Sequence, residues 1–163
     1  MTAAKFVIEL NEVVDLLNTS ERGIAILDHI SMKKRRMDYN NEIAALINNY
    51  DVELGKFGDF SLFSRLQVNE NFFFFGTFDG DYLGISRKNQ GISIVESSAQ
   101  FHVLVDCALS DRHFLDIFYV YVVRYLHFLK GLSFSLPEKQ ILIDYCGGDQ
   151  FSAFVRYIFP DLE

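Results

Sequence analysis

Hydrophobic residues recur at helical spacing near both ends of this chain, and strand-like patterns fill its middle. Residues 5–18 predict an amphipathic helix, because apolar side chains gather on one face and acidic side chains on the other. Residues 38–50 predict a second helix from the same spacing. Towards the end, residues 111–130 predict the longest helix, and two shorter helices are expected at residues 137–145 and 149–160.

The densest apolar stretch lies at residues 71–85, where four consecutive phenylalanines precede Gly76 and an Asp-Gly-Asp sequence. Such a continuous aromatic run suits a strand that is covered on both faces. Asp79-Gly80 is a strong turn dipeptide, so we predict a turn over residues 76–81 with a strand on each side. The predicted strands are residues 52–54, 60–63, 72–75, 82–86, 92–95 and 101–105. Their short connections favour a largely antiparallel meander.

This order of elements predicts a single α+β domain, with two helices, then the strands, then three helices packed around one sheet. Polar side chains occupy only a narrow stripe of the helix at residues 111–130, so this helix should be the main cover of the sheet. Truncation of Phe118 or Leu126 to alanine should then destabilise the protein by roughly 2–5 kcal/mol.

Composition and charge bear on the class of partner. The 163 residues are 50% hydrophobic, with 17 Phe, 8 Tyr and no Trp, so they can supply a substantial core. The net charge of −7 disfavours nucleic acid or an anionic membrane as a partner and favours a basic protein. Residues 51–81 carry six acidic and two basic residues, which predicts an acidic surface in this part of the chain. The alternative is that the charge serves only solubility.

The expected location is the cytoplasm. Residues 1–9 lack the pattern of a signal peptide. The most apolar segment, residues 114–129, is interrupted by Asp116, Arg124 and His127, which argues against a membrane span. Cys107 and Cys146 are therefore expected to be buried free thiols.

No catalytic, cofactor or metal site is expected. His102 and Asp106 should project from one face of a strand and Cys107 from the other, so the three cannot meet. His113 and His127 are about 21 Å apart along a helix, too far to share a metal ion. The glycines around the Asp-Gly-Asp turn match no phosphate-binding fingerprint. The basic run at residues 33–36 could bind phosphate or act in targeting, but we interpret it as a solvated face.

Three segments together resemble the SUKH superfamily of bacterial immunity proteins, a group that also includes fungal cell-wall synthesis regulators. The first is Phe-Gly-Thr-Phe-Asp-Gly-Asp-Tyr-Leu-Gly-Ile at residues 75–85, in which Gly76, Gly80 and Asp81 fill a G-x-x-x-G-D pattern. The second is a strand that passes into a helix through Ser110-x-x-x-Phe114-Leu115. The third is the double-glycine turn and aromatic helix of residues 145–154. Together they cover residues 72–158.

This resemblance implies an α+β domain with a sheet of about six strands. It also implies a non-catalytic immunity protein that binds and neutralises a cognate polymorphic toxin. A nuclease toxin would suit an acidic inhibitor, because nuclease active sites must be cationic to hold phosphates. The candidate toxin-binding residues are Asp59, Glu70, Asp79, Asp81 and Tyr82. Two alternatives stay open: a cytoplasmic regulatory interaction module of the same fold, and a small-molecule binding domain that uses the aromatic residues as a pocket lining.

Overall fold

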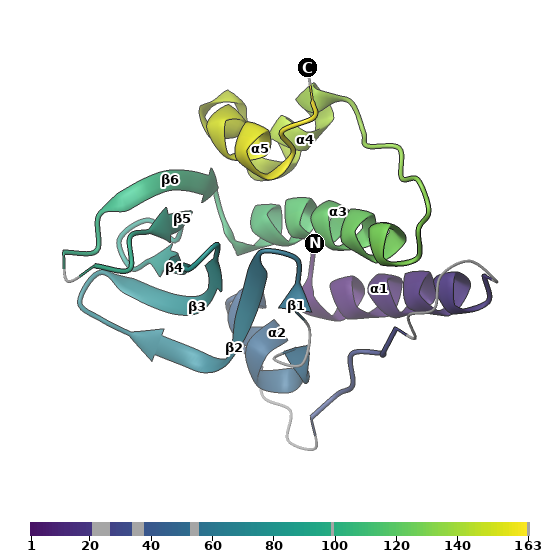
Figure 1. Ribbon diagram of the computed structural model, residues 1–163. Coiled ribbons are helices and arrows are strands. Elements are labelled where there is room, and N and C mark those ends of the chain that lie inside the picture. The colour runs from purple at the N-terminus through teal and green to yellow at the C-terminus, as the bar shows by residue number, and fades with distance from the viewer. Residues whose placement is uncertain (21–26, 34–37, 53–55, 99, 163) are drawn as a thin grey trace.

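The computed structural model describes residues 1–163 with the exception of residues 21–26, 34–37, 53–55, 99 and 163. The described chain folds as an α+β domain with one antiparallel sheet, as predicted (Figure 1). Its helices are α1 (Ala3–Asn18), α2 (Glu42–Asn49), α3 (Asp111–Leu129), α4 (Lys139–Cys146), the short 3-10 helix η2 (Asp149–Phe151) and α5 (Ser152–Ile158). Its strands are β1 (Lys56–Phe57), β2 (Phe60–Val68), β3 (Phe72–Phe78), β4 (Asp81–Ser86), β5 (Ile92–Val95) and β6 (Val103–Ala108).

Side-chain caps fix where the first three helices begin. The Thr2 hydroxyl accepts a hydrogen bond from Lys5 N, so α1 starts two residues before the predicted point. Asn41 accepts from Ala44 N and delays α2 to Glu42, whereas the predicted helix began at residue 38. Ser110 caps α3, as the sequence indicates. Local polar side chains, more than the apolar spacing, therefore define these boundaries.

The sheet is a simple meander in which each strand pairs with the next along the chain. Five strands have four residues or more, and β1 adds a two-residue edge beside β2. The predicted turn at residues 76–81 was wrong in extent, because β3 continues through Gly76 to Phe78 and only Asp79 and Gly80 connect it to β4. A Cβ atom on Gly76 would lie 2.3 Å from the Ser61 carbonyl oxygen, so glycine allows β2 and β3 to approach each other.

Two other strand predictions differ from the structure. Strand β2 extends to Val68, five residues beyond the predicted end, and it crosses a register shift after Leu62. Strand β6 begins at Val103, because Phe101 has a φ of 49° that breaks the extended backbone. The predicted strand at residues 52–54 lies mostly outside the described part of the chain.

The four consecutive phenylalanines of β3 alternate between the two faces of the sheet. Phe75 is fully buried in the main core, where the helices cover one face, and Phe73 packs against that core. Phe72 and Phe74 form a second cluster with Val95 on the opposite face, where Tyr82, Phe63 and Phe101 cover them. The expected coverage of both faces is confirmed, although aromatic side chains and not helices cover the second face.

Charged groups join the N-terminal ends of α1, α2 and α3. Glu42 accepts a hydrogen bond from Ala3 N at 2.9 Å and pairs with Arg112 at 3.3 Å. Asp111 in turn accepts a hydrogen bond from the Glu42 backbone N–H. Carboxylates at helix N-termini satisfy exposed N–H groups and oppose the helix dipole. This network therefore holds α1, α2 and α3 in register beside the sheet.

The described chain contains no helix that is both long and apolar enough to cross a bilayer. Cys107 and Cys146 are free and buried, as predicted. Burial raises the pKa of Cys146 to about 12 and raises the pKa of Cys107 well above its ordinary value. Both thiols are therefore protonated and function as small apolar groups in the core.

Candidate binding surface

Three of the predicted acidic residues gather at one end of the sheet. Strands β2 and β3 are antiparallel, with Phe60 opposite Phe78, so the turn before β2 lies beside the turn after β3. The backbone N–H of Asp79 donates to the carbonyl of Asp59 at 3.0 Å. Asp81 begins β4 directly after this turn, and its Oδ1 accepts from Ser97 N at 3.0 Å. We call Asp59, Asp79 and Asp81 the acidic sheet end.

Glu70 does not belong to this group. It lies in the turn between β2 and β3, next to the pair of Val68 and Phe73, at the opposite end of both strands. The seven residues of β3 separate the two ends, and their backbone spans roughly 20 Å at the usual rise of a strand. The Arg87 guanidinium donates to the Glu70 carbonyl there. Glu70 is therefore close to the aspartates along the chain but far from them in space.

Tyr82 lies beside the acidic sheet end but points elsewhere. Its ring centroid is 4.8 Å from that of Phe74 and 6.2 Å from that of Phe101, within the aromatic cluster on the face away from the helices. Gly84 makes room for this cluster, since a Cβ there would lie 3.0 Å from the Phe72 ring. The half-buried Tyr82 ring therefore serves packing first.

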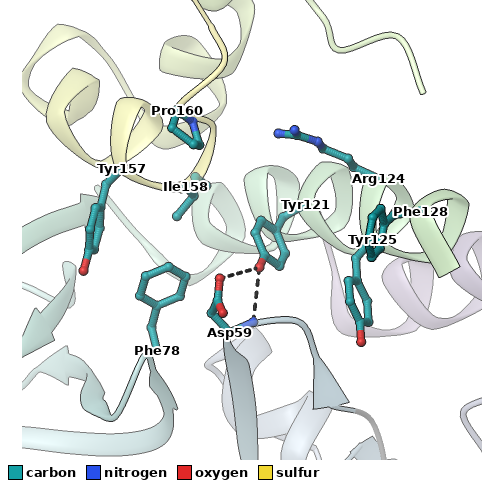
Figure 2. A pocket seen from close by; sticks show the side chains of 9 residues that line it. All are labelled: Asp59, Phe78, Tyr121, Arg124, Tyr125, Phe128, Tyr157, Ile158 and Pro160. Carbon is teal, nitrogen blue, oxygen red and sulfur yellow. Dashed lines mark hydrogen bonds between the residues drawn. The ribbon is translucent and has the colours of Figure 1, made fainter. Parts of the chain in front are cut away.

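A groove adjoins the acidic sheet end and was not predicted from the sequence. It encloses about 290 Å³ between the turns, the C-terminal half of α3 and α5. Figure 2 shows its lining residues, which are Asp59, Phe78, Tyr121, Arg124, Tyr125, Phe128, Tyr157, Ile158 and Pro160. We call it the tyrosine groove. Four of these residues, Tyr121, Arg124, Tyr125 and Phe128, recur along α3 at i, i+3, i+4 and i+7, so this spacing was the signal in the sequence that could have indicated the groove.

Asp59 joins the tyrosine groove to the acidic sheet end. The Tyr121 hydroxyl donates to Asp59 Oδ2 at 3.3 Å and accepts from Asp59 N at 3.2 Å. Gly58, with a φ of 62°, allows this contact, because a Cβ there would lie 2.5 Å from the Tyr121 hydroxyl oxygen. Burial, and then the charge of Asp59, raise the pKa of Tyr121, although the Asp59 N–H opposes the shift. The phenol therefore stays neutral and able to donate.

The rest of the groove combines a neutralised cation with exposed rings. Arg124 pairs with Asp161 and lies over the Phe159 ring at 5.7 Å from its centroid. Phe128 is 73% exposed and Tyr157 is 51% exposed, the latter with its ring 5.3 Å from that of Phe78. Exposed aromatic side chains such as these are enriched in protein-binding surfaces.

The histidine and cysteine side chains that could have served catalysis or metal binding make structural contacts instead. His113 bonds to the Ser110 hydroxyl at 2.8 Å, and His127 Nδ1 lies 2.8 Å from the Val123 carbonyl oxygen. His102 is exposed and bonds to Gln100, whereas Cys107 is buried. Within the described ranges, no three His, Cys, Asp or Glu side chains are grouped so that they could hold a metal ion. Of the basic run, Lys33 donates to the Ile47 carbonyl at 2.8 Å, and residues 34–36 lie outside the described chain.

A scan against protein-family models, a search of curated proteins and a search of solved structures each found no match to this chain. The function is therefore inferred from the geometry of the surface and from the sequence motifs.

Proposed function

We propose that this protein is a non-catalytic bacterial immunity protein of the SUKH type, which binds and neutralises a cognate toxin in the cytoplasm. The observation that carries the proposal is the tyrosine groove beside the acidic sheet end, where exposed rings and carboxylates lie together. Tyrosine and arginine residues dominate binding energy in protein interfaces, and flanking charges steer the approach of the partner.

Two of the three motifs lie at or beside the proposed surface. The glycine-rich motif contributes Phe78, Asp79 and Asp81, and the double-glycine turn leads through η2 into α5, which lines the groove with Tyr157 and Ile158. The Ser-Phe-Leu motif starts α3 and lies at the other end of that helix from the groove. Asp59 and Asp79 are the principal carboxylates of this surface, and Asp81 is secondary because it also holds Ser97 N.

A basic toxin is the partner that the charge favours, and a nuclease is one class that meets this condition. The tyrosine groove is open to solvent, and the rings of Phe128 and Tyr157 stand at its rim. A small-molecule pocket would bury most of its ligand. The open shape therefore favours a protein partner over the small-molecule alternative.

Co-expression with candidate toxins encoded beside the gene tests the proposal. The chain should restore growth of cells that produce the cognate toxin, and it should capture that toxin in a pull-down. The double variant Asp59→Asn, Asp79→Asn should weaken capture at least about tenfold, since charge-assisted contacts are among the strongest polar contacts. Asparagine tolerates the φ of 48° at position 79, so the turn should persist.

The matched control is Asp28→Asn, Asp38→Asn, which removes two exposed carboxylates that do not line the groove. It should leave capture and growth unchanged. Equal capture by the two double variants would overturn the assignment of the surface. Absence of both protection and capture for every neighbouring toxin would overturn the function itself.

A further inference from the structure

The tyrosine groove has the features of a receptor for a cationic side chain. Figure 2 shows Asp59 between the rings of Phe78 and Tyr121 on the floor of the groove. Oδ2 of Asp59 accepts a hydrogen bond from the Tyr121 hydroxyl, and within the described chain no donor contacts Oδ1. A half-satisfied carboxylate flanked by aromatic rings can bind a cation through both a charge-assisted hydrogen bond and the faces of the rings.

The charges around the groove favour a cation over an anion. Among the described residues of the lining, Arg124 is the only basic one, and Asp161 and the Phe159 ring already engage it. Asp79 adds a second negative charge next to Asp59, because the two residues share a backbone hydrogen bond. An anionic ligand would have to displace Asp161 and approach two carboxylates, whereas a cation meets a field of the favourable sign.

We propose that the tyrosine groove binds one arginine side chain of the partner protein, with its guanidinium on Asp59. This inference rests on the proposed function for the identity of the partner. Arginine fits better than lysine because its planar guanidinium stacks on aromatic rings and presents paired N–H donors to a carboxylate. The volume of about 290 Å³ accommodates one such side chain and would leave a folded segment outside the groove.

A probe that needs no toxin tests this inference. The peptides acetyl-Gly-Arg-Gly-amide and acetyl-Gly-citrulline-Gly-amide differ by the charge of one side chain. Titration of the full chain, followed by the NMR signals of its tyrosine rings, should give a dissociation constant of about 1–10 mM for the arginine peptide. The citrulline peptide should bind at least about tenfold more weakly, because it cannot make the charge-assisted contact.

Variants locate the binding. Asp59→Asn should reduce arginine binding to the citrulline level, and its urea unfolding midpoint should report whether the fold is intact. Tyr157→Ala removes a ring that is 51% exposed, so it tests the groove with little effect on the core. It should weaken arginine binding several-fold. Asp28→Asn, the matched removal of an exposed carboxylate that does not line the groove, should change nothing.

The outcomes separate this inference from the proposed function. Equal binding of the two peptides, or unchanged arginine binding in Asp59→Asn, would overturn the arginine site even if the toxin is captured. Selective arginine binding by a chain that captures no toxin would support the site and overturn the immunity function. Arginine-dependent shifts confined to tyrosines outside the groove would also overturn the site.

Discussion

At the scale of single residues, glycines decide where the chain can approach itself closely. Gly58 and Gly76 each stand where a Cβ would collide with another part of the molecule, with the Tyr121 hydroxyl in one case and the Ser61 carbonyl in the other. Gly80 also has a positive φ, of 90°, but its missing Cβ faces open space. Glycine composition indicates turns, but only the surroundings distinguish a conformational role from a steric one.

The comparison of Gly58 with Gly80 yields a prediction. Gly80→Ala should cost about 1–2 kcal/mol from the left-handed backbone alone. Gly58→Ala should cost about 1 kcal/mol more, because the new methyl group displaces the Tyr121 hydroxyl. Urea unfolding of both variants measures the difference.

The double variant Gly58→Ala, Tyr121→Phe provides the control, since it removes the colliding oxygen. It should recover most of the additional cost in a double-mutant cycle. An equal cost for Gly58→Ala in both backgrounds would show that Tyr121 does not constrain the turn.

The two buried thiols give a prediction for alkaline pH. Their pKa values are raised by burial, so the folded chain keeps protons that the unfolded chain releases above about pH 8.5. Stability should therefore fall as the pH rises from 8 to 10, by at most about 1.4 kcal/mol per pH unit for each thiol. Urea midpoints at the two pH values measure this slope.

The variant Cys107→Ala, Cys146→Ala should show a shallower pH dependence than the natural chain. The remaining slope would come from Tyr119 and Tyr121, whose pKa values burial also raises. An unchanged slope would mean that the thiols ionise in the folded state as readily as in the unfolded state.

At the scale of elements, helix starts follow from local sequence, but the relation between helices does not. Thr2, Asn41 and Ser110 cap their helices by accepting from backbone N–H groups three residues further along the chain. The bond from Ala3 N to Glu42 joins residues 39 positions apart, and that from Glu42 N to Asp111 joins residues 69 positions apart. No periodicity in the sequence predicts hydrogen bonds between residues so far apart.

Glu42 should therefore matter more than an ordinary surface acid. Glu42→Ala should lower the free energy of unfolding by about 1–2 kcal/mol, because Ala3 N and Arg112 both lose their partner. Glu42→Gln should cost less, since its amide oxygen can still accept from Ala3 N. Thermal unfolding measures the melting temperature of each variant. Unchanged melting temperatures in both variants would contradict this role of Glu42.

At the scale of the whole molecule, one aromatic core unites helices and sheet. The Phe118 ring of α3 stacks on Phe6 of α1 at 5.5 Å and lies 5.7 Å from Phe57 of β1 and 5.1 Å from Phe60 of β2. Figure 1 shows α3 between α1 on one side and the C-terminal helices α4 and α5 on the other. The buried face of α3 contacts Phe57, Phe60 and Phe75 of the sheet, but α2 and α5 also pack against the sheet, so α3 is one of several covers and not the predicted main one.

Phe118 and Phe128 lie on the same helix and provide a matched pair. Phe118 is 1% exposed, so Phe118→Ala should cost about 3–5 kcal/mol, whereas Phe128 is 73% exposed and Phe128→Ala should cost less than about 0.5 kcal/mol. Phe118→Leu keeps a measurable fold if the alanine variant does not fold. Similar unfolding midpoints for the Phe118 and Phe128 variants would contradict the central position of Phe118.

The sequence by itself determined the α+β class, the antiparallel meander, the major helices and the buried state of the cysteines, because hydrophobic period, turn dipeptides and caps act over a few residues. It also identified Asp59, Asp79 and Asp81 as acidic positions near turns. Only the tertiary structure decided that these three lie together and that Glu70 lies at the other end of the sheet. The tyrosine groove likewise exists only after folding, since α3, α5 and two turns meet there from distant parts of the chain.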